Sequence, residues 1–218
     1  MLDQVYSIQR LLRERVSNIV VMGSGEPMDN YENIVKFVRI ISSEMGLNIS
    51  QRNITVSTCG IVPKIRQLAD EGLNITLALS LHAPNDEIRR TIMPVANKYA
   101  LKDVISACDY YFKKTGRRVS YEYSLVAGVN DNIEEAKKLV KLVNGRNIHI
   151  NLIPVNPIKE RDFKQSDKLK IKAFREFLEK KGVNATVRRE MGRDIDGACG
   201  QLRRRFIETN GGSESLEV

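Results

Sequence analysis

The sequence has few cysteines, and their spacing argues against two kinds of site. Only three occur in 218 residues, Cys59, Cys108 and Cys199, and they lie far apart. An odd number of scattered cysteines does not make the disulfide framework of a small secreted domain. No two of them have the C-x-x-C or C-x-x-x-C spacing of iron–sulfur ligands. We therefore expect no metal or iron–sulfur site built from this chain alone.

The sequence also lacks any segment that would direct it into or across a membrane. No apolar run is long enough to span a bilayer. The first residues have neither the basic start nor the continuous apolar stretch of a signal peptide. With 42% hydrophobic and 28% charged residues, the composition is typical of a soluble globular protein. We therefore expect a cytoplasmic protein with no membrane partner.

Positive charge exceeds negative charge, with a net charge of +8 and a pI near 9.4. A basic protein attracts polyanions, so nucleic acid is a natural class of partner, although many enzymes are basic without binding RNA. Six arginines lie between residues 188 and 205, among them the run Arg203-Arg204-Arg205. Their forked side chains suit phosphate groups. A solvated charged face is the alternative interpretation of this run.

Apolar β-branched runs alternate with amphipathic stretches along the chain. The predicted strands are residues 18–22, 53–57, 75–80, 119–125, 148–153 and 184–188. The predicted helices are residues 2–16, 31–45, 61–71, 101–115, 132–143 and 167–181. This alternation implies parallel strands joined by helical crossovers, in an α/β fold that is either an open (βα) barrel or a doubly wound sheet. One domain is expected over residues 1–207, followed by a polar tail at 208–218.

Single residues mark several helix boundaries. Asn30 is predicted to cap the helix that follows it, and Asn85 to cap the short turn over residues 86–88. Gly72, Gly116 and Gly182 are predicted to end helices in a left-handed conformation. In the last helix, apolar residues at helical spacing are predicted to face the core: Leu169, Ala173, Phe174, Phe177 and Leu178.

Small, polar or charged residues follow the strands at the ends where parallel α/β folds place their sites. These segments are residues 23–27, 57–60, 80–82, 154–157 and 188–190. Five such segments in register predict one shared rim. In the first of them, Glu26 could accept hydrogen bonds from an amino group. On its shape alone, however, this segment is better interpreted as a glycine-rich turn, because Met28 breaks the G-x-G-x-x-G pattern.

One histidine and one cysteine are the candidates for chemistry. His82 follows a predicted strand at the rim and favours a ligand contact, whereas His149 lies within a strand and is interpreted as packing. Cys199 is flanked by glycine and alanine, which would leave its thiol accessible, and nearby arginines would favour its thiolate. Cys108 on a predicted helix is interpreted as a buried apolar side chain, and Cys59 is intermediate.

Taken together, these residues resemble the radical S-adenosylmethionine (SAM) methyltransferases that act on adenine C2 in large-subunit ribosomal RNA and in some transfer RNAs. The resemblance extends from about Leu2 to Phe206. Its most specific segments are residues 25–27, 57–58, 80–86, 151–154 with 156–157, and 194–196 with 198–202. Several long matches in a fixed order make chance similarity very improbable.

The resemblance implies a partial (βα) barrel of the radical SAM type that binds SAM. The residues implied to hold SAM are Gly25, Glu26, Ser57, Ser80, Leu81, His82 and Asn156. It further implies that one SAM methylates Cys199, and that a radical formed from a second SAM abstracts a hydrogen from this methyl group. The resulting carbon radical would add to adenine C2, an electron-poor carbon that ordinary polar methyl transfer would not modify. The implied partners are ribosomal RNA, transfer RNA and an electron donor, and we expect a monomer.

The sequence departs from the family pattern at its start. The family's C-x-x-x-C-x-x-C motif, which holds a [4Fe–4S] cluster, should follow a strand upstream of residues 2–16, and this sequence does not contain it. The N-terminal RNA-binding domain, a second catalytic cysteine and an upstream glutamate base are absent too, and Ser24 replaces a usual methionine. We therefore expect a fragment that lacks the first strand and the cluster loop and is inactive alone. The alternatives are a non-catalytic remnant that binds SAM or RNA, and the related enzyme that methylates adenine C8.

Overall fold

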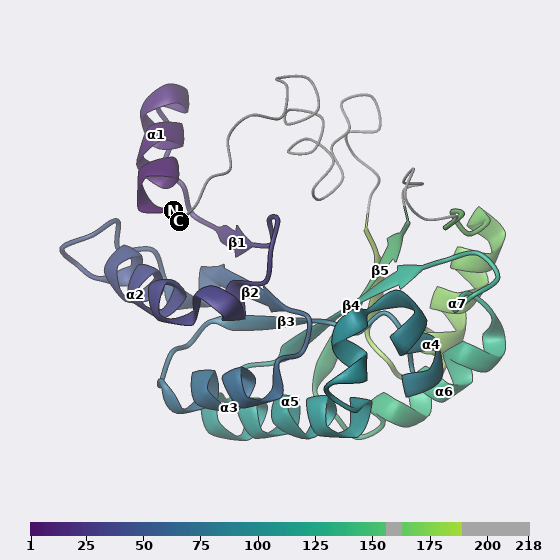
Figure 1. Cartoon of the computed structure of the whole chain (residues 1–218). Coiled ribbons are helices and arrows are strands. Elements are labelled where there is room, and N and C mark those ends of the chain that lie inside the picture. The colour runs from purple at the N-terminus through teal and green to yellow at the C-terminus, as the bar shows by residue number, and fades with distance from the viewer. Residues whose placement is uncertain (156–162, 189–218) are drawn as a thin grey trace, which may run out of the picture.

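The computed structural model describes residues 1–155 and 163–188 as a curved sheet with helices along one side (Figure 1). The strands lie side by side in chain order: β1 (Ile19–Val21), β2 (Ile54–Thr58), β3 (Thr76–Ser80), β4 (Val119–Leu125), β5 (Ile148–Pro154) and β6 (Ala185–Val187). Every neighbouring pair is parallel. The predicted α/β fold with six parallel strands is confirmed. Because the strand order never reverses, the doubly wound alternative is wrong.

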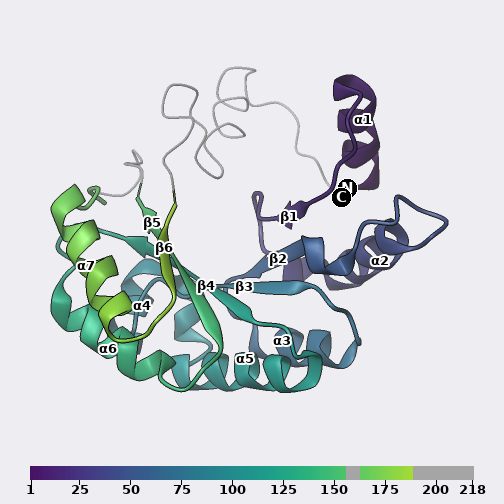
Figure 2. The same cartoon turned by 180° about the vertical axis from the view of Figure 1, so that it is seen from behind.

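Helix α1 (Leu2–Leu12) precedes β1. The other helices lie between successive strands as crossovers: α2 (Tyr31–Ser42), α3 (Val62–Asp70), α4 (Asp86–Ile92), α5 (Leu101–Thr115), α6 (Ile133–Val143) and α7 (Lys168–Lys180). Three 3-10 turns join them: η1 (Pro27–Asn30), η2 (Gln51–Asn53) and η3 (Pro94–Asn97). Helices α2 to α7 lie on one side of the sheet, as crossovers of one hand require (Figures 1 and 2). None of the residues of α1 is buried. Within the described residues, every helix is too short or too polar to cross a membrane.

Side chains alternate along each strand between the helix-covered core and the opposite, inner face of the sheet. In β4, Tyr121, Tyr123 and Leu125 are fully buried and belong to the apolar core. The intervening Glu122 lies on the inner face, where it pairs in register with Ser80 of β3 and Asn151 of β5. Polar side chains from three neighbouring strands therefore lie side by side on the inner face, which makes it the side that can bind a polar ligand.

The predicted helix boundaries are confirmed in most but not all cases. Asn85 caps α4, since its Oδ1 accepts from the Ile88 N–H at 2.9 Å. Asn30 does not cap α2, because its Oδ1 instead accepts from the Asn33 side chain at 2.7 Å. The three predicted terminal glycines all have a positive φ: Gly72, Gly116 and Gly182. The domain boundary predicted at residue 207 lies outside the described residues, and so does the Arg203-Arg204-Arg205 run.

The core face of α7 differs in part from the predicted stripe. Phe174 and Leu178 are fully buried, but Leu169 is 77% exposed. Leu169 lies two residues before the buried Ile171, roughly 200° around the helix at 3.6 residues per turn, so it is on the opposite face from the buried row. The buried row instead starts at Ile171 and continues at helical spacing to the two deeper residues.

Candidate functional site

The carboxyl ends of β1 to β3 bring the predicted ligand-binding residues onto one edge of the sheet. Gly25 and Glu26 follow β1, Ser57 lies near the end of β2, and Ser80 ends β3 with Leu81 and His82 directly after it. We call this edge the rim. Two further predicted residues, Asn156 and Cys199, lie outside the described residues.

The Glu26 carboxylate ties the first two rim segments together. Its Oε1 accepts from the Met28 N–H at 3.1 Å, and its Oε2 accepts from the Cys59 N–H at 2.7 Å. Gly25, immediately before it, has φ +94, a conformation that favours glycine. A carboxylate offers about four lone-pair positions, so two remain for a ligand. The glutamate of this turn is therefore held in place by backbone groups and is not a freely solvated side chain.

Ser57 and Cys59 extend the same contact between β1 and β2. The Ser57 hydroxyl donates to the Val21 carbonyl at 2.9 Å. Burial, and then the neighbouring Glu26 carboxylate, raise the pKa of the Cys59 thiol to about 12. Cys59 is therefore a neutral thiol near pH 7 and is not a nucleophile. Cys108 is buried as predicted, and burial raises the pKa of its thiol to about 12 as well.

His82 leaves β3 in an uncommon backbone conformation, with φ +56. Its ring Nδ1 accepts a hydrogen bond from the Ser124 N–H at 3.0 Å. A ring nitrogen that accepts from an N–H carries no proton, so the proton of the neutral ring is on Nε2. Burial, and to a lesser degree the charge of Arg89, lower the pKa of His82 to about 4. Near neutral pH, His82 is thus a neutral hydrogen-bond donor and is not a general base.

The low pKa of His82 predicts an acid-sensitive stability. The folded value of about 4 lies below the ordinary 6.5, so the unfolded chain binds more protons between these two values. The stabilisation is complete above about pH 6.5, is lost as the pH falls through 4, and amounts to at most about 3 kcal/mol. Urea unfolding across this range should show the slope in the wild type and in His149→Asn. An equal slope in His82→Asn would contradict the assignment.

Arg89 of α4 supports the rim from the core side. Its side chain is fully buried, and burial lowers the pKa of the guanidinium. Its Nε donates to the Leu81 carbonyl at 3.1 Å. Its Nη2 donates to the carbonyls of Cys59 at 2.7 Å and Ser80 at 3.3 Å. One cation thus joins the segments that follow β2 and β3. Leu81 itself is fully buried, and both of its backbone polar groups are bonded within the protein, the N–H to the Glu122 carbonyl and the carbonyl to Arg89.

The inner face below the rim carries a carboxylate that the sequence analysis did not single out. Glu122 is 8% exposed, and its two oxygens accept from the Ser120 hydroxyl at 3.0 Å and the Asn151 amide at 2.8 Å. Its backbone carbonyl accepts from the N–H groups of Leu81 and His82. Glu122 therefore lies directly beneath the rim. Arg89, Glu122 and Asn130, which bonds the His82 carbonyl, were all missed because each depends on contacts between distant segments.

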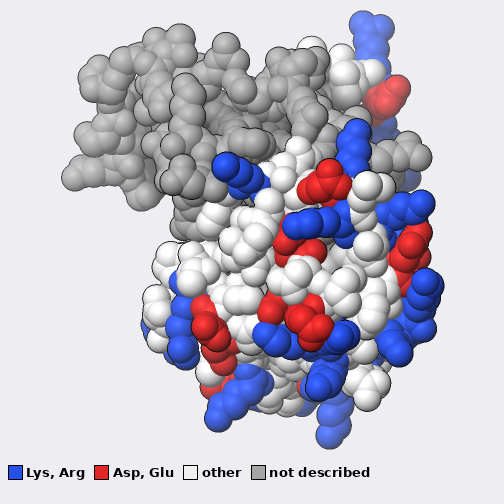
Figure 3. Space-filling model, turned by 90° about the vertical axis from the view of Figure 1, so that its right-hand side faces the viewer, with Lys and Arg blue, Asp and Glu red and all other residues white. Residues whose placement is uncertain are grey.

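The side formed by α6 and α7 carries both kinds of charge, with more basic than acidic side chains on the two helices. Figure 3 looks onto this side and shows basic and acidic side chains interspersed. Lys137, Lys138 and Lys170 form ion pairs with Glu134, Glu135 and Asp131. Exposed pairs of this kind add little stability.

A family model described as the radical SAM superfamily matches residues 2–143. The chain belongs to the radical SAM superfamily. A curated relative from Lachnospira eligens, named "Probable dual-specificity RNA methyltransferase RlmN", is 66% identical over 208 residues, and one of the same name from Lachnoclostridium phytofermentans is 69% identical. Each alignment covers 95% of this chain, but only 59% and 58% of the two relatives.

A solved radical SAM methyltransferase from Sphaerobacter thermophilus supports this placement. It is 45% identical to this chain, with a TM-score of 0.89 over 93% of this chain and 60% of that one. This radical SAM chain therefore spans about three fifths of the length of the relatives it matches.

Membership of the radical SAM superfamily implies SAM and a [4Fe–4S] cluster, and the described residues fit the first. The rim offers a carboxylate with free lone pairs at Glu26 and a directed donor at His82, which suit a ligand with both an ammonium and acceptor groups. The described residues do not fit a cluster. Within residues 1–155 and 163–188, no three histidine, cysteine or acidic side chains gather as a metal site. The only cysteines there, Cys59 and Cys108, are thiols of raised pKa.

Proposed function

We propose that this chain is the barrel part of a radical SAM enzyme that methylates C2 of an adenine in 23S ribosomal RNA and in transfer RNA. The observation that carries the proposal is the rim itself. It gathers Glu26, Ser57, Ser80 and His82 in a chain 66% identical to an enzyme named as a dual-specificity RNA methyltransferase. The electron donor, a monomeric state and a cytoplasmic location belong to the same proposal.

Each rim residue has a task in this proposal that follows from its contacts. Glu26 keeps two lone-pair positions that can accept from the ammonium group of SAM. The His82 Nε2–H donates to an acceptor on the ligand, and the low pKa of this ring keeps its proton in place near neutral pH. Gly25, Ser57 and Ser80 line the same edge, and Leu81 and Asn156 are proposed SAM-binding residues on the strength of the sequence resemblance alone. When bound, SAM supplies the methyl group and, after reductive cleavage, a radical.

Cys199 is the proposed carrier of the methyl group. Its sequence neighbours Gly197, Ala198 and Gly200 are small, which would leave the thiol accessible, and Arg193 and Arg203 nearby in the sequence would favour its thiolate. A thiolate is a good nucleophile toward the methyl group of SAM. Neither thiol of the described residues can take this role near neutral pH, because burial raises the pKa values of both Cys59 and Cys108.

A chimera tests the proposal. Whatever segment of the Lachnospira eligens relative precedes its match to this chain is joined in front of Leu2. The chimera is produced in bacteria whose own adenine-C2 methyltransferase gene is deleted, and the nucleosides of their RNA are analysed by mass spectrometry. We expect 2-methyladenosine in 23S ribosomal RNA and in transfer RNA. 8-Methyladenosine would instead support the related C8 enzyme. An unmethylated adenine, with the intact relative active in parallel, would support a non-catalytic remnant.

A further inference from the structure

His82 is held by three contacts, two at its backbone and one at its ring. Its N–H donates to the Glu122 carbonyl at 3.2 Å, and its ring Nδ1 accepts from the Ser124 N–H at 3.0 Å. Its carbonyl accepts from the Asn130 side chain at 2.7 Å. A residue with a side chain keeps a positive φ only where the surrounding structure determines it. The three contacts supply that constraint, and two of them come from β4 and one from the segment that follows it.

Asn130 is the residue that connects these contacts. Its side chain is fully buried, and its Nδ2 donates to the carbonyls of both His82 and Ser124, each at 2.7 Å. Its Oδ1 accepts from the Val126 N–H at 2.7 Å. An asparagine amide has two donor hydrogens, and here both are used, so neither aspartate nor leucine could replace it. Asn130 therefore acts on His82 twice, directly at its carbonyl and indirectly through Ser124, whose N–H meets the ring.

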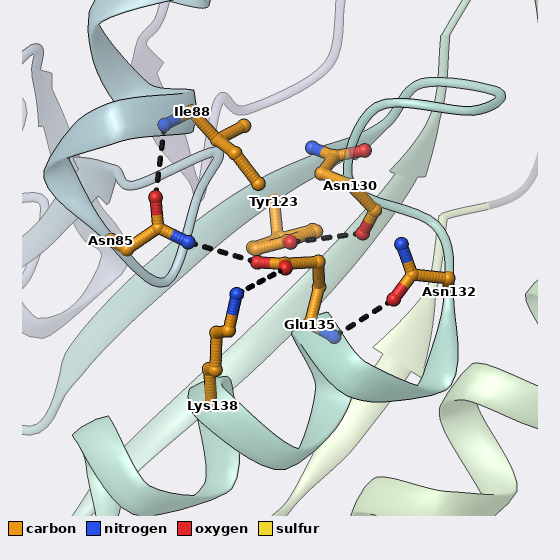
Figure 4. Close-up of polar contacts among 7 residues, drawn as sticks. All are labelled: Asn85, Ile88, Tyr123, Asn130, Asn132, Glu135 and Lys138. Carbon is orange, nitrogen blue, oxygen red and sulfur yellow. Dashed lines mark hydrogen bonds and ion pairs between the residues drawn. The ribbon is translucent and has the colours of Figure 1, made fainter.

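The Asn130 segment is itself anchored to the core and to α6, as Figure 4 shows. The Tyr123 hydroxyl, from the buried face of β4, donates to the Asn130 carbonyl at 3.0 Å. On the other side, the Asn85 amide donates to the buried Glu135 of α6 at 3.0 Å. Asn132 caps α6 by accepting from the Glu135 N–H at 3.0 Å. The loops after β3 and β4 are thus joined to each other and to one helix, so Asn130 rests on a rigid support.

We propose that Asn130 is a positioning residue that holds His82 in a single tautomer and orientation, with Nε2–H presented to the ligand of the rim. The amide acts on a neighbour and does not touch the ligand itself. This inference depends on the proposed function in one respect, the identification of the rim ligand as SAM. A residue such as Asn130, which fixes the rotamer of a neighbouring binding group, determines whether that group can reach the ligand.

The chain has only two histidines, so nitrogen NMR of the imidazole rings tests the proposal directly. In the wild type, long-range proton–nitrogen spectra should show His82 with its proton on Nε2 alone and no titration above about pH 5. In Asn130→Ala, both tautomers should appear, and the pKa of His82 should rise toward 6.5. Affinity for SAM should fall about tenfold, the value of one well-placed hydrogen bond.

Asn132→Ala is the matched control, because it removes a nearby asparagine that caps α6 but makes no bond to His82. It should leave the tautomer unchanged. The proposal is overturned if Asn130→Ala keeps the single Nε2–H tautomer, or if wild-type His82 carries its proton on Nδ1, a result that needs no folded variant. If wild-type His82 shows the expected tautomer but its resonances do not change on adding SAM, the proposed function is contradicted. The positioning role of Asn130 is then unaffected.

Discussion

Replacing Cys199 with alanine in the chimera is expected to abolish methylation of RNA, with a loss of at least about a thousandfold. The reason is chemical, because alanine has no atom that can accept and then release a methyl group. SAM binding should persist, since the rim residues that hold SAM in our proposal lie far from residue 199 in sequence. The measurement is the yield of 2-methyladenosine by nucleoside mass spectrometry.

Cys108→Ala provides the control for Cys199→Ala. The Cys108 side chain is 1% exposed within α5, and it packs in the core on the helix-covered side of the sheet. We expect its replacement to change the yield by no more than about twofold, since removing one buried sulfur affects stability more than chemistry. Normal methylation by Cys199→Ala would remove the methyl-carrier role from this residue.

Replacing Arg89 with methionine is expected to lower the free energy of unfolding by about 3 kcal/mol. Methionine fills similar volume but leaves the carbonyls of Cys59, Ser80 and Leu81 without their charged donor. Each hydrogen bond from a charged donor contributes roughly 1.5–3 kcal/mol, and relief from burying a cation offsets part of the loss. Urea unfolding monitored by circular dichroism gives the value.

Arg90 offers the matched comparison, because it is the next residue of α4 and is exposed. Arg90→Met should change the free energy of unfolding by no more than about 0.5 kcal/mol. If Arg89→Met proved as stable as Arg90→Met, the buried guanidinium would not hold the segments after β2 and β3, and our account of the rim's support would be wrong.

The strands could be predicted from the sequence because each is marked by a local pattern of apolar residues. In each strand apolar residues run together or alternate with polar ones, and all six strands lie within one residue of their predicted bounds. The positions of Ser57, Ser80 and His82 at one edge followed from strand–helix alternation alone, since parallel strands end at the same edge. α4 was foreseen only as a short turn, although its cap Asn85 was recognised, because a helix of seven residues shows little periodicity.

The supporting residues of the rim could not be predicted, because their roles arise from contacts between distant segments. Glu122 meets Ser80 only through the register of β3 and β4. Asn130 stands in a polar loop, where asparagine is common for local turns. Arg89 follows a helix cap in a charged segment, where an exposed side chain is the ordinary expectation. Leu169 shows the opposite error: it was predicted to be buried, but the buried row of α7 runs through Ile171, Phe174 and Leu178, on the other face of the helix.

The central claim is that the rim at the carboxyl ends of the strands binds SAM, and titration of the isotope-labelled chain with SAM tests it most directly. His82 lies at this rim, whereas His149 lies near the amino end of β5 and bonds Asn184 and Thr186. We predict that SAM shifts the imidazole resonances of His82 and leaves those of His149 unchanged, and that Glu26→Gln weakens the response while Glu32→Gln on α2 does not. A shift of His149 alone, or no shift of His82 at millimolar SAM, would contradict the account.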